Sequence, residues 1–152
     1  MAMSLTPSTA ASMATLWIRH RLRPLFDRLA DPSLLVRLDH LAARPHLFGP
    51  PTPPSLLHGD LWSGNVDACE GRPVIFDPAV YGGHREIDLA MLLLFGSLSS
   101  RFLDAYGEVH PLDDEWRSRV PLWQLYPLAV HAVLFGGGYA RQIDACFDQL
   151  GL

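Results

Sequence analysis

The 152-residue sequence contains no lysine, so arginines provide all 12 of its basic side chains. Its two cysteines, Cys69 and Cys146, are too few for a disulfide framework and lack metal-ligand spacing, which favours reduced thiols in a cytoplasmic protein. The net charge of -4 argues against nucleic acid or an anionic membrane as partner. The most apolar run, residues 87–96, is too short to span a bilayer.

The N-terminal stretch lacks the features of a secretory signal. It has neither a positively charged segment nor a continuous apolar one, although a transit-type segment stays an open alternative. We therefore expect residues 1–15 to be a poorly ordered leader and residues 16–152 to form one domain.

Apolar spacing and turn residues predict an α+β fold that is mainly helical. Pro24 is expected to kink or divide the first helix, and Asp31 is expected to cap the second. Residues 48–55 read as an extended connector, residues 55–58 as a short strand, and residues 66–77 as a small β hairpin. Further helices are predicted at 85–95, 99–106, 113–135 with interruptions at Pro121 and Pro127, and 139–150.

The polar residues around this hairpin have the spacing of a phosphoryl-transfer site. The loop HGDLWSGN places Asn65 five residues after Asp60, and Asp77 ends the second predicted strand. A loop aspartate can accept the proton of an attacking hydroxyl, and carboxylate and amide oxygens suit Mg²⁺. Protein kinases use H-R-D-x-x-x-x-N and a later D-F-G in this way. Asp60 is therefore the candidate base, and Asn65 and Asp77 are the candidate Mg²⁺ and nucleotide ligands.

Each of these residues also has a plainer interpretation. Gly59 and Asp60 are common turn residues, and Asp77 precedes a proline. His58 is expected to support the loop by hydrogen bonds rather than to act as a base. Asp88 is either a surface carboxylate or an acceptor for backbone N–H groups that makes the loop rigid.

The segments HGDLWSGN and DPAVYGGHREIDLAM resemble the fructosamine/ketosamine-3-kinase family, a branch of the aminoglycoside-phosphotransferase-like and protein-kinase-like fold. The similarity runs from about Trp17 to the C-terminus. It implies ATP-dependent, Mg²⁺-requiring phosphorylation of the 3-hydroxyl of ketosamines, free or protein-bound, in deglycation repair. The resemblance implies the same roles for Asp60 as base and for Asn65 and Asp77 as Mg²⁺ and nucleotide ligands. Trp62 is either a part of the sugar site or a core residue.

Kinases of this fold also need a glycine-rich loop and a lysine from an N-terminal lobe. The sequence has neither, because its one glycine cluster, residues 136–138, reads as a helix stop. We therefore expect a C-terminal lobe without its N-terminal lobe, weak or inactive alone, with apolar surface exposed for that lobe or for self-association. The alternatives are a phosphotransferase for another small acceptor, such as an aminoglycoside or choline, and a non-catalytic binding protein derived from a kinase.

Overall fold

The computed structural model describes residues 10–152 of the protein, and the first nine residues of the expected leader lie outside this range. It is mainly helical with two small β pairs, so the predicted α+β class is confirmed. The helices are α1 (Ala10–Leu16), a π-helical segment (Trp17–Leu22), α2 (Arg23–Leu29), α3 (Pro32–Ala42), α4 (Glu86–Leu94), α5 (Ser100–Val109), α6 (Val120–Phe135) and α7 (Tyr139–Gln149). The strands are β1 (Ser55–Leu57), β2 (Val66–Cys69), β3 (Arg72–Ile75) and β4 (Tyr81–Gly83). Short 3₁₀ segments span Pro45–Phe48, Ser63–Asn65 and Trp116–Arg119.

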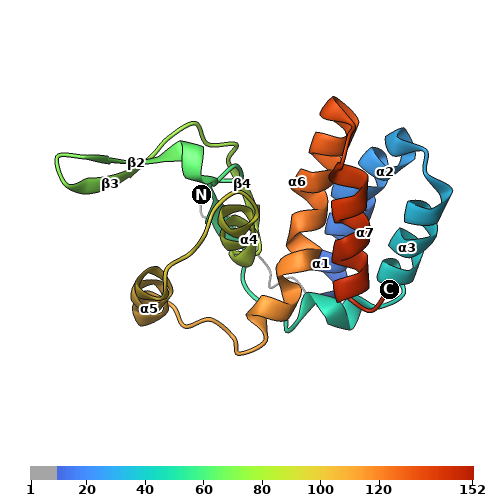
Figure 1. Ribbon diagram of the computed structural model, residues 1–152. Coiled ribbons are helices and arrows are strands. Elements are labelled where there is room, and N and C mark those ends of the chain that lie inside the picture. The colour runs from blue at the N-terminus through green and yellow to red at the C-terminus, as the bar shows by residue number, and fades with distance from the viewer. Residues whose placement is uncertain (1–9) are drawn as a thin grey trace, which may run out of the picture.

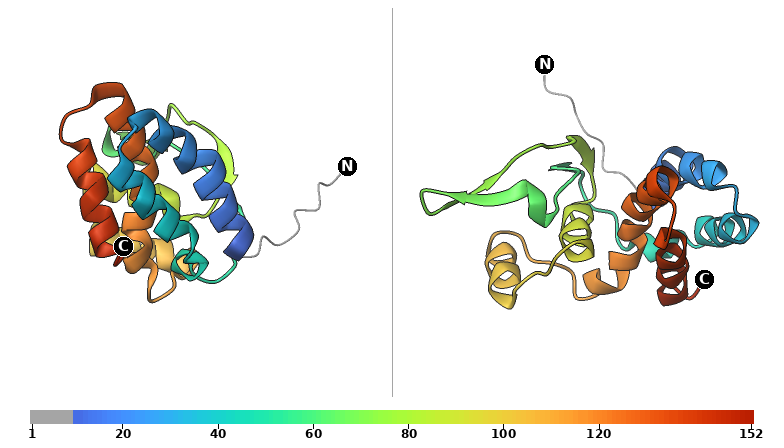
Figure 2. Two further views of the ribbon diagram at one scale, coloured as in Figure 1. Left: turned by 90° about the vertical axis from the view of Figure 1, so that its right-hand side faces the viewer. Right: turned by 45° about the horizontal axis from the view of Figure 1, so that its top comes forward.

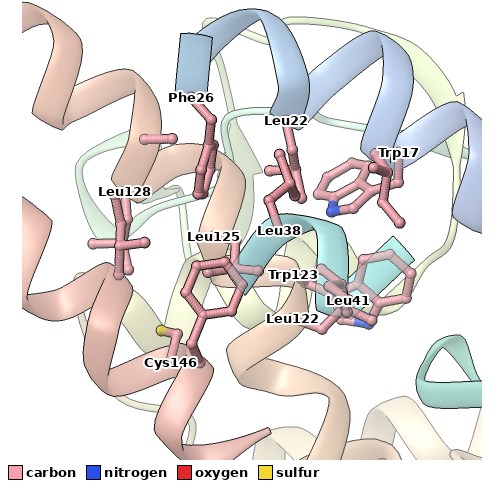
Figure 3. Close-up of a cluster of buried hydrophobic side chains, with 14 of the residues drawn as sticks. Trp17, Leu22, Phe26, Leu38, Leu41, Leu122, Trp123, Leu125, Leu128 and Cys146 are labelled. Carbon is pink, nitrogen blue, oxygen red and sulfur yellow. The ribbon is translucent and has the colours of Figure 1, made fainter. Parts of the chain in front are cut away.

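The hydrophobic core forms where α6 packs against α7, the π-helical segment and α2 (Figure 3). Trp17 and Trp123 meet edge to face with ring centroids 5.3 Å apart, and Phe26 meets Phe147 in the same way at 5.9 Å. α2, α3 and α7 lie together at one end of the molecule, away from the strands (Figures 1 and 2). Large buried aromatic and aliphatic side chains of this kind supply most of the stability of a small domain. No helix within residues 10–152 has the length and apolarity needed to cross a bilayer.

The helix boundaries agree with the sequence at Asp31 and differ from it at the N-terminus. The Asp31 side chain accepts the backbone N–H groups of Ser33 and Leu34 at 2.9 and 3.3 Å, so its predicted N-cap role is confirmed. The first helical run is continuous from Ala10 to Leu29, with α1 and α2 joined by the π-helical segment. Residues 10–15 are therefore helical, although the sequence placed them in a poorly ordered leader.

The interruption predicted at Pro127 is wrong, because α6 runs through it without a break. Pro127 removes one helical hydrogen bond, which costs about 3 kcal/mol in an isolated helix. Leu125, Leu128 and Ala129 beside it are buried, and this burial outweighs the loss. Pro121 lies in the first turn of α6, directly after a 3₁₀ segment, where proline is favourable.

The strands form two separate antiparallel pairs. β2 and β3 make the predicted hairpin, with Val66 opposite Ile75 and Cys69 opposite Arg72. Its two-residue turn has positive φ at Glu70 and Gly71, as the twist of a tight hairpin requires. The hairpin projects away from the helices (Figure 1).

β4 was not expected from the sequence, because its two glycines are poor strand formers. It pairs with β1 in the register Ser55 to Gly83 and Leu57 to Tyr81. This pair brings both ends of residues 58–80 together beside α4, so the whole loop and hairpin leave the domain from one place.

Candidate functional site

A single carboxylate fixes the start of the HGDLWSGN loop. Asp88, on the first turn of α4, accepts the backbone N–H of His58 at 2.8 Å through one oxygen and that of Gly59 at 2.9 Å through the other. Charge-assisted hydrogen bonds of this type are stronger than neutral ones. They fix the peptide groups directly before Asp60, the candidate base.

His58 joins this loop to the end of the hairpin. Its Nε2 lies 2.9 Å from the carbonyl oxygen of Phe76 and therefore carries the proton, which leaves Nδ1 to accept the N–H of Asp60 at 3.4 Å. The backbone carbonyl of His58 accepts the N–H of Ala79 at 2.8 Å. The contacts of this buried side chain are thus those of a loop-supporting residue.

Asn65 lies directly against Asp60. Its Nδ2 donates to the backbone oxygen of Asp60 at 2.9 Å and to the carboxylate Oδ2 at 3.2 Å. Since both bonds use the amide nitrogen, they orient the side chain with its oxygen as the remaining ligand atom. The side chain is buried, so this orientation is held firmly.

The neighbours of Asp77 in the chain, Phe76 and Ala79, bond to the same loop. The preceding residue, Phe76, donates its N–H to the carbonyl of Asn65 at 3.2 Å and bonds to His58, while Ala79 bonds to His58 on the other side. Asp77 itself has a φ of 52°, an unusual conformation for a residue other than glycine. Strained backbone of this kind is often found at functional sites.

The predicted ligands Asn65 and Asp77 carry oxygen atoms of the kind that Mg²⁺ binds. Mg²⁺ prefers hard oxygen ligands and keeps several waters, so one or two carboxylates and an amide oxygen are a suitable set. Asp77 makes no side-chain hydrogen bond within residues 10–152, which leaves its carboxylate available. The same part of the chain holds no cluster of three or more His, Cys, Asp or Glu side chains arranged for a metal ion. Asn65 and Asp77 would therefore hold the ion weakly on their own, with the remaining positions open to phosphate and water.

A cavity of about 500 Å³ opens beside Asp60. The loop, with Trp62, forms one wall, and α4 and α6 form the others through mostly apolar and aromatic side chains. This volume is typical of small-ligand pockets. Trp62 is partly exposed and its ring lies 6.4 Å from that of Phe95, so it belongs to the cavity wall and not to the core.

Tyr81 forms another part of this wall. Burial raises the pKa of Tyr81 to about 12, against a smaller opposing effect of Arg21, so its hydroxyl stays protonated at neutral pH. The guanidinium carbon of Arg21 lies 4.1 Å from the centre of the Tyr81 ring and 5.3 Å from that of Tyr126. A terminal guanidinium nitrogen of Arg21, Nη1, also donates to the Tyr126 hydroxyl at 3.3 Å. Sequence reasoning assigned no role to these three residues.

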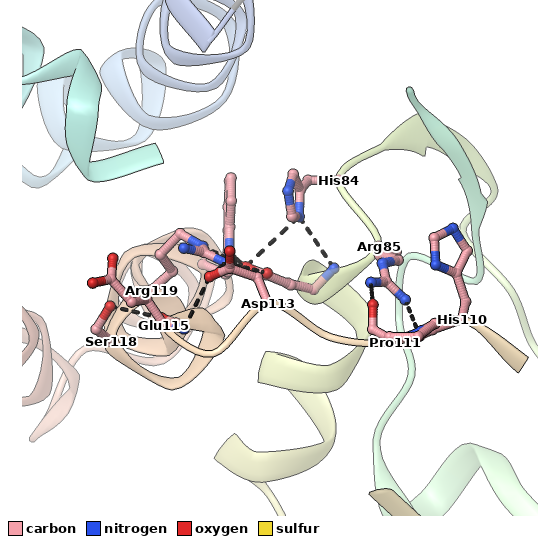
Figure 4. Close-up of polar contacts among 10 residues, drawn as sticks. His84, Arg85, His110, Pro111, Asp113, Glu115, Ser118 and Arg119 are labelled. Carbon is pink, nitrogen blue, oxygen red and sulfur yellow. Dashed lines mark hydrogen bonds and ion pairs between the residues drawn. The ribbon is translucent and has the colours of Figure 1, made fainter. Parts of the chain in front are cut away.

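A buried ion pair between Arg119 and Glu86 adjoins the cavity wall at Trp123, and Figure 4 shows Arg119 among its polar contacts. Arg119 donates to both oxygens of Glu86, from Nε at 2.9 Å and from NH2 at 2.7 Å. Trp123, which lines the cavity, donates its indole N–H to the same carboxylate at 3.0 Å. His84 stacks on Trp123 at 5.0 Å, and burial lowers the pKa of this imidazole. Sequence reasoning did not identify this cluster, since Glu86 and Arg119 are 33 residues apart.

Most of the chain is similar in sequence to known proteins. The family model described as fructosamine kinase matches residues 12–151. A probable ketoamine kinase from Enterococcus faecium is 52% identical over 97 residues, which are 63% of this chain and 35% of that protein. A probable ketoamine kinase from Thermus thermophilus is 40% identical over 118 residues, covering 78% of this chain and 43% of that protein.

Solved structures agree with these sequence matches. A fructosamine-3-kinase candidate from Thermobifida fusca superposes with a TM-score of 0.84 at 42% identity, over 90% of this chain and 50% of that one. Another from Haemophilus somnus gives 0.77 at 25% identity, over 91% and 49%. The chain thus spans between about a third and half the length of these relatives. With a family match over nearly all of its residues, the chain belongs to the fructosamine kinase family.

Proposed function

We propose that this chain is the C-terminal, acceptor-binding lobe of a protein-kinase-like ketosamine kinase, which phosphorylates the 3-hydroxyl of ketosamines with ATP. The observation that carries the proposal is the contact of Asn65 with Asp60, in a loop fixed by Asp88 and open to a cavity of about 500 Å³. Asp60 would accept the proton of the sugar hydroxyl as the phosphoryl group transfers.

The metal would serve to neutralise phosphate charge when it is bound with the nucleotide. Asn65 and Asp77 would hold it, since they offer an amide oxygen and a carboxylate, and the contact of Asn65 with Asp60 supports a place beside the base. Asp88 and His58 act on the reaction only through the loop, by keeping the backbone around Asp60 in one conformation. Trp62 and the apolar walls would exclude water and pack against the sugar.

A second lobe is needed for efficient catalysis under this proposal. Kinases of this fold grip the phosphates with a glycine-rich loop and a lysine, and this sequence offers no lysine. The hairpin supports docking of such a lobe, because apolar side chains on it and just after it are exposed: Val66, Val74, Ile75, Phe76 and Val80. Exposed apolar surface of this extent is typical of an interface.

Nucleotide binding tests the metal site. Isothermal titration of the 152-residue chain with Mg²⁺ and a non-hydrolysable ATP analogue should show weak binding that Asp77→Ala abolishes. Asp104→Ala, an exposed carboxylate on α5, serves as the matched control and should leave binding unchanged. Binding that survives Asp77→Ala unaltered would contradict the metal role.

Phosphoryl transfer tests the acceptor. The chain would be mixed with the separately produced N-terminal half of the Thermobifida fusca relative, with fructosyl-lysine and radiolabelled ATP. We expect phosphorylated fructosyl-lysine, and no product with Asp60→Asn. Turnover of an aminoglycoside in place of fructosyl-lysine would identify another small-molecule phosphotransferase. Failure of every complementing lobe would favour a non-catalytic binding protein.

A further inference from the structure

A second, smaller cavity of about 190 Å³ adjoins the one beside Asp60. The two share Tyr81 and Ile87 in their walls, so they adjoin at these side chains. Tyr81 also lies close to Gly59, since a Cβ added to that glycine would come 2.8 Å from the tyrosine ring. The Tyr81 side chain therefore lies next to both the small cavity and the loop that carries Asp60.

Arg21 lines this small cavity and has no carboxylate partner. Arg23, Arg37 and Arg119 each form ion pairs, whereas no ion pair within the described residues includes Arg21. Its guanidinium is half-buried against Tyr81 and Tyr126, and only the bond to the Tyr126 hydroxyl uses one of its five N–H donors. A cation that is partly removed from water and lacks a counter-ion is well suited to bind an anion.

The surroundings of Arg21 leave room for such an anion. Gly82 and Gly83 line the same cavity, and a Cβ at Gly82 would meet nothing within 4 Å. His20 lies beside Arg21 on the exposed side. The carboxylate of Asp88, whose charge acts on Tyr81, bonds to the N–H groups of His58 and Gly59 and forms no ion pair with Arg21.

We propose that Arg21 binds the carboxylate of a glycated amino acid whose sugar occupies the cavity beside Asp60. The inference rests on the proposed function and narrows its acceptor class. A free ketosamine with a carboxylate next to the glycated amine would place its sugar in the larger cavity and its carboxylate in the smaller one, beside Arg21. An adduct on a lysine within a protein chain has no carboxylate at that distance from its sugar and leaves Arg21 without a partner.

Two ligands that differ only in the carboxylate test whether Arg21 binds that group. Titration calorimetry on the 152-residue chain would compare Nα-fructosylglycine with Nα-fructosylglycinamide, which has a neutral amide in place of the carboxylate. We expect the acid to bind the wild-type protein about tenfold more tightly, a typical effect of one charge-assisted hydrogen-bonded contact. In Arg21→Gln this preference should disappear, and in Arg21→Lys, which keeps the charge but loses the planar fork, it should be reduced.

Arg19→Gln is the matched control, because Arg19 is an exposed arginine on the same helical segment. It should keep the full preference for the acid. Equal binding of acid and amide to the wild type would overturn the inference without any variant, as would failure of both to bind at millimolar concentration. So would a preference that survives Arg21→Gln in a protein shown to be folded by circular dichroism.

The two proposals can fail separately. A chain whose nucleotide binding depends on Asp77 but which does not distinguish acid from amide refutes the role of Arg21 alone. A chain that prefers the acid through Arg21 but binds no nucleotide refutes the kinase mechanism and leaves a carboxylate-binding site.

Discussion

The carboxylate of Asp88 lies 2.8 Å from the backbone nitrogen of His58, and this contact ties the first turn of α4 to the start of the candidate catalytic loop. Its second oxygen binds the next N–H of the loop. These two hydrogen bonds attach the polar loop to α4 and make it a rigid part of the domain. The conformation of the loop therefore depends on a residue that lies outside the loop, on α4.

Asp88→Asn should loosen this loop. The asparagine offers one acceptor oxygen and no charge, so one of the two N–H groups loses its partner. We expect a loss of about 1–3 kcal/mol in the free energy of unfolding. Urea denaturation measures it, and hydrogen exchange at His58 and Gly59 should accelerate. Asp104→Asn, on the exposed side of α5, is the control and should change neither the free energy of unfolding nor the exchange rates. Unchanged exchange at His58 and Gly59 in Asp88→Asn would refute the role of Asp88 in holding the loop.

Arg119→Met should be strongly destabilising. The methionine leaves Glu86 buried with no cation, and an unpaired buried charge costs about 3–5 kcal/mol. Adding Glu86→Gln to Arg119→Met should recover part of this loss, since the remaining amide carries no charge. The neighbouring exposed Arg117→Met is the control and should cost about 1 kcal/mol or less. Urea denaturation of the wild type, the two single variants Arg119→Met and Glu86→Gln, and the double variant closes the cycle, and additive effects would contradict the coupling.

His84 should make stability depend on pH. Burial lowers its pKa below the ordinary value of 6.5, so the unfolded chain takes up a proton at a pH where the folded chain does not. Well above pH 6.5, the free energy of unfolding therefore does not depend on His84. It falls as the pH drops through 6.5, because the unfolded chain then takes up the proton. Between pH 7.5 and 5.5 the wild type should lose up to about 1.4 kcal/mol more than His84→Gln. Equal losses in the two proteins, measured by urea denaturation, would exclude a neutral buried His84.

Gly59→Ala should disrupt the loop more than its small size suggests. Gly59 has a φ of 82°, and an added Cβ would come within 2.2 Å of the carbonyl oxygen of Ala79. Since backbone has to move, we expect a loss of at least about 2 kcal/mol. Gly107→Ala is the control, because that glycine lies in α5 with open space around it and alanine favours a helix by up to about 1 kcal/mol. Thermal unfolding of both variants measures the contrast.

The sequence predicted those features that depend on near neighbours. The cap at Asp31 and the turn at Glu70 and Gly71 involve residues within a few positions of each other, and both are present. The spacing of Asp60, Asn65 and Asp77 selected a loop and a hairpin that the structure brings into one region. Their proposed chemical roles stay predictions until nucleotide binding is measured.

Contacts between distant parts of the chain could not be predicted. Arg21 meets Tyr126 across 105 residues, and Glu86 meets Arg119 across 33. Nothing in a single sequence indicates which arginine is paired and which is not. Pro127 was given too much weight. Proline does destabilise a helix interior, but the free energy gained from packing α6 is larger than that cost, and the helix continues through Pro127.

The π-helical segment has a consequence for how this chain tolerates length changes. The N–H of Arg23 bonds to the carbonyl of Ile18, five residues back, so the turn holds one residue more than an α-helix would. Deleting a single residue there would restore the ordinary pitch and leave the flanking segments in their present register, because the widened turn already absorbs the extra residue. Trp17 would then still face Trp123, so a one-residue deletion at this turn should do less harm than a deletion inside a regular helix such as α6, which would rotate one part of the helix by about 100° relative to the other.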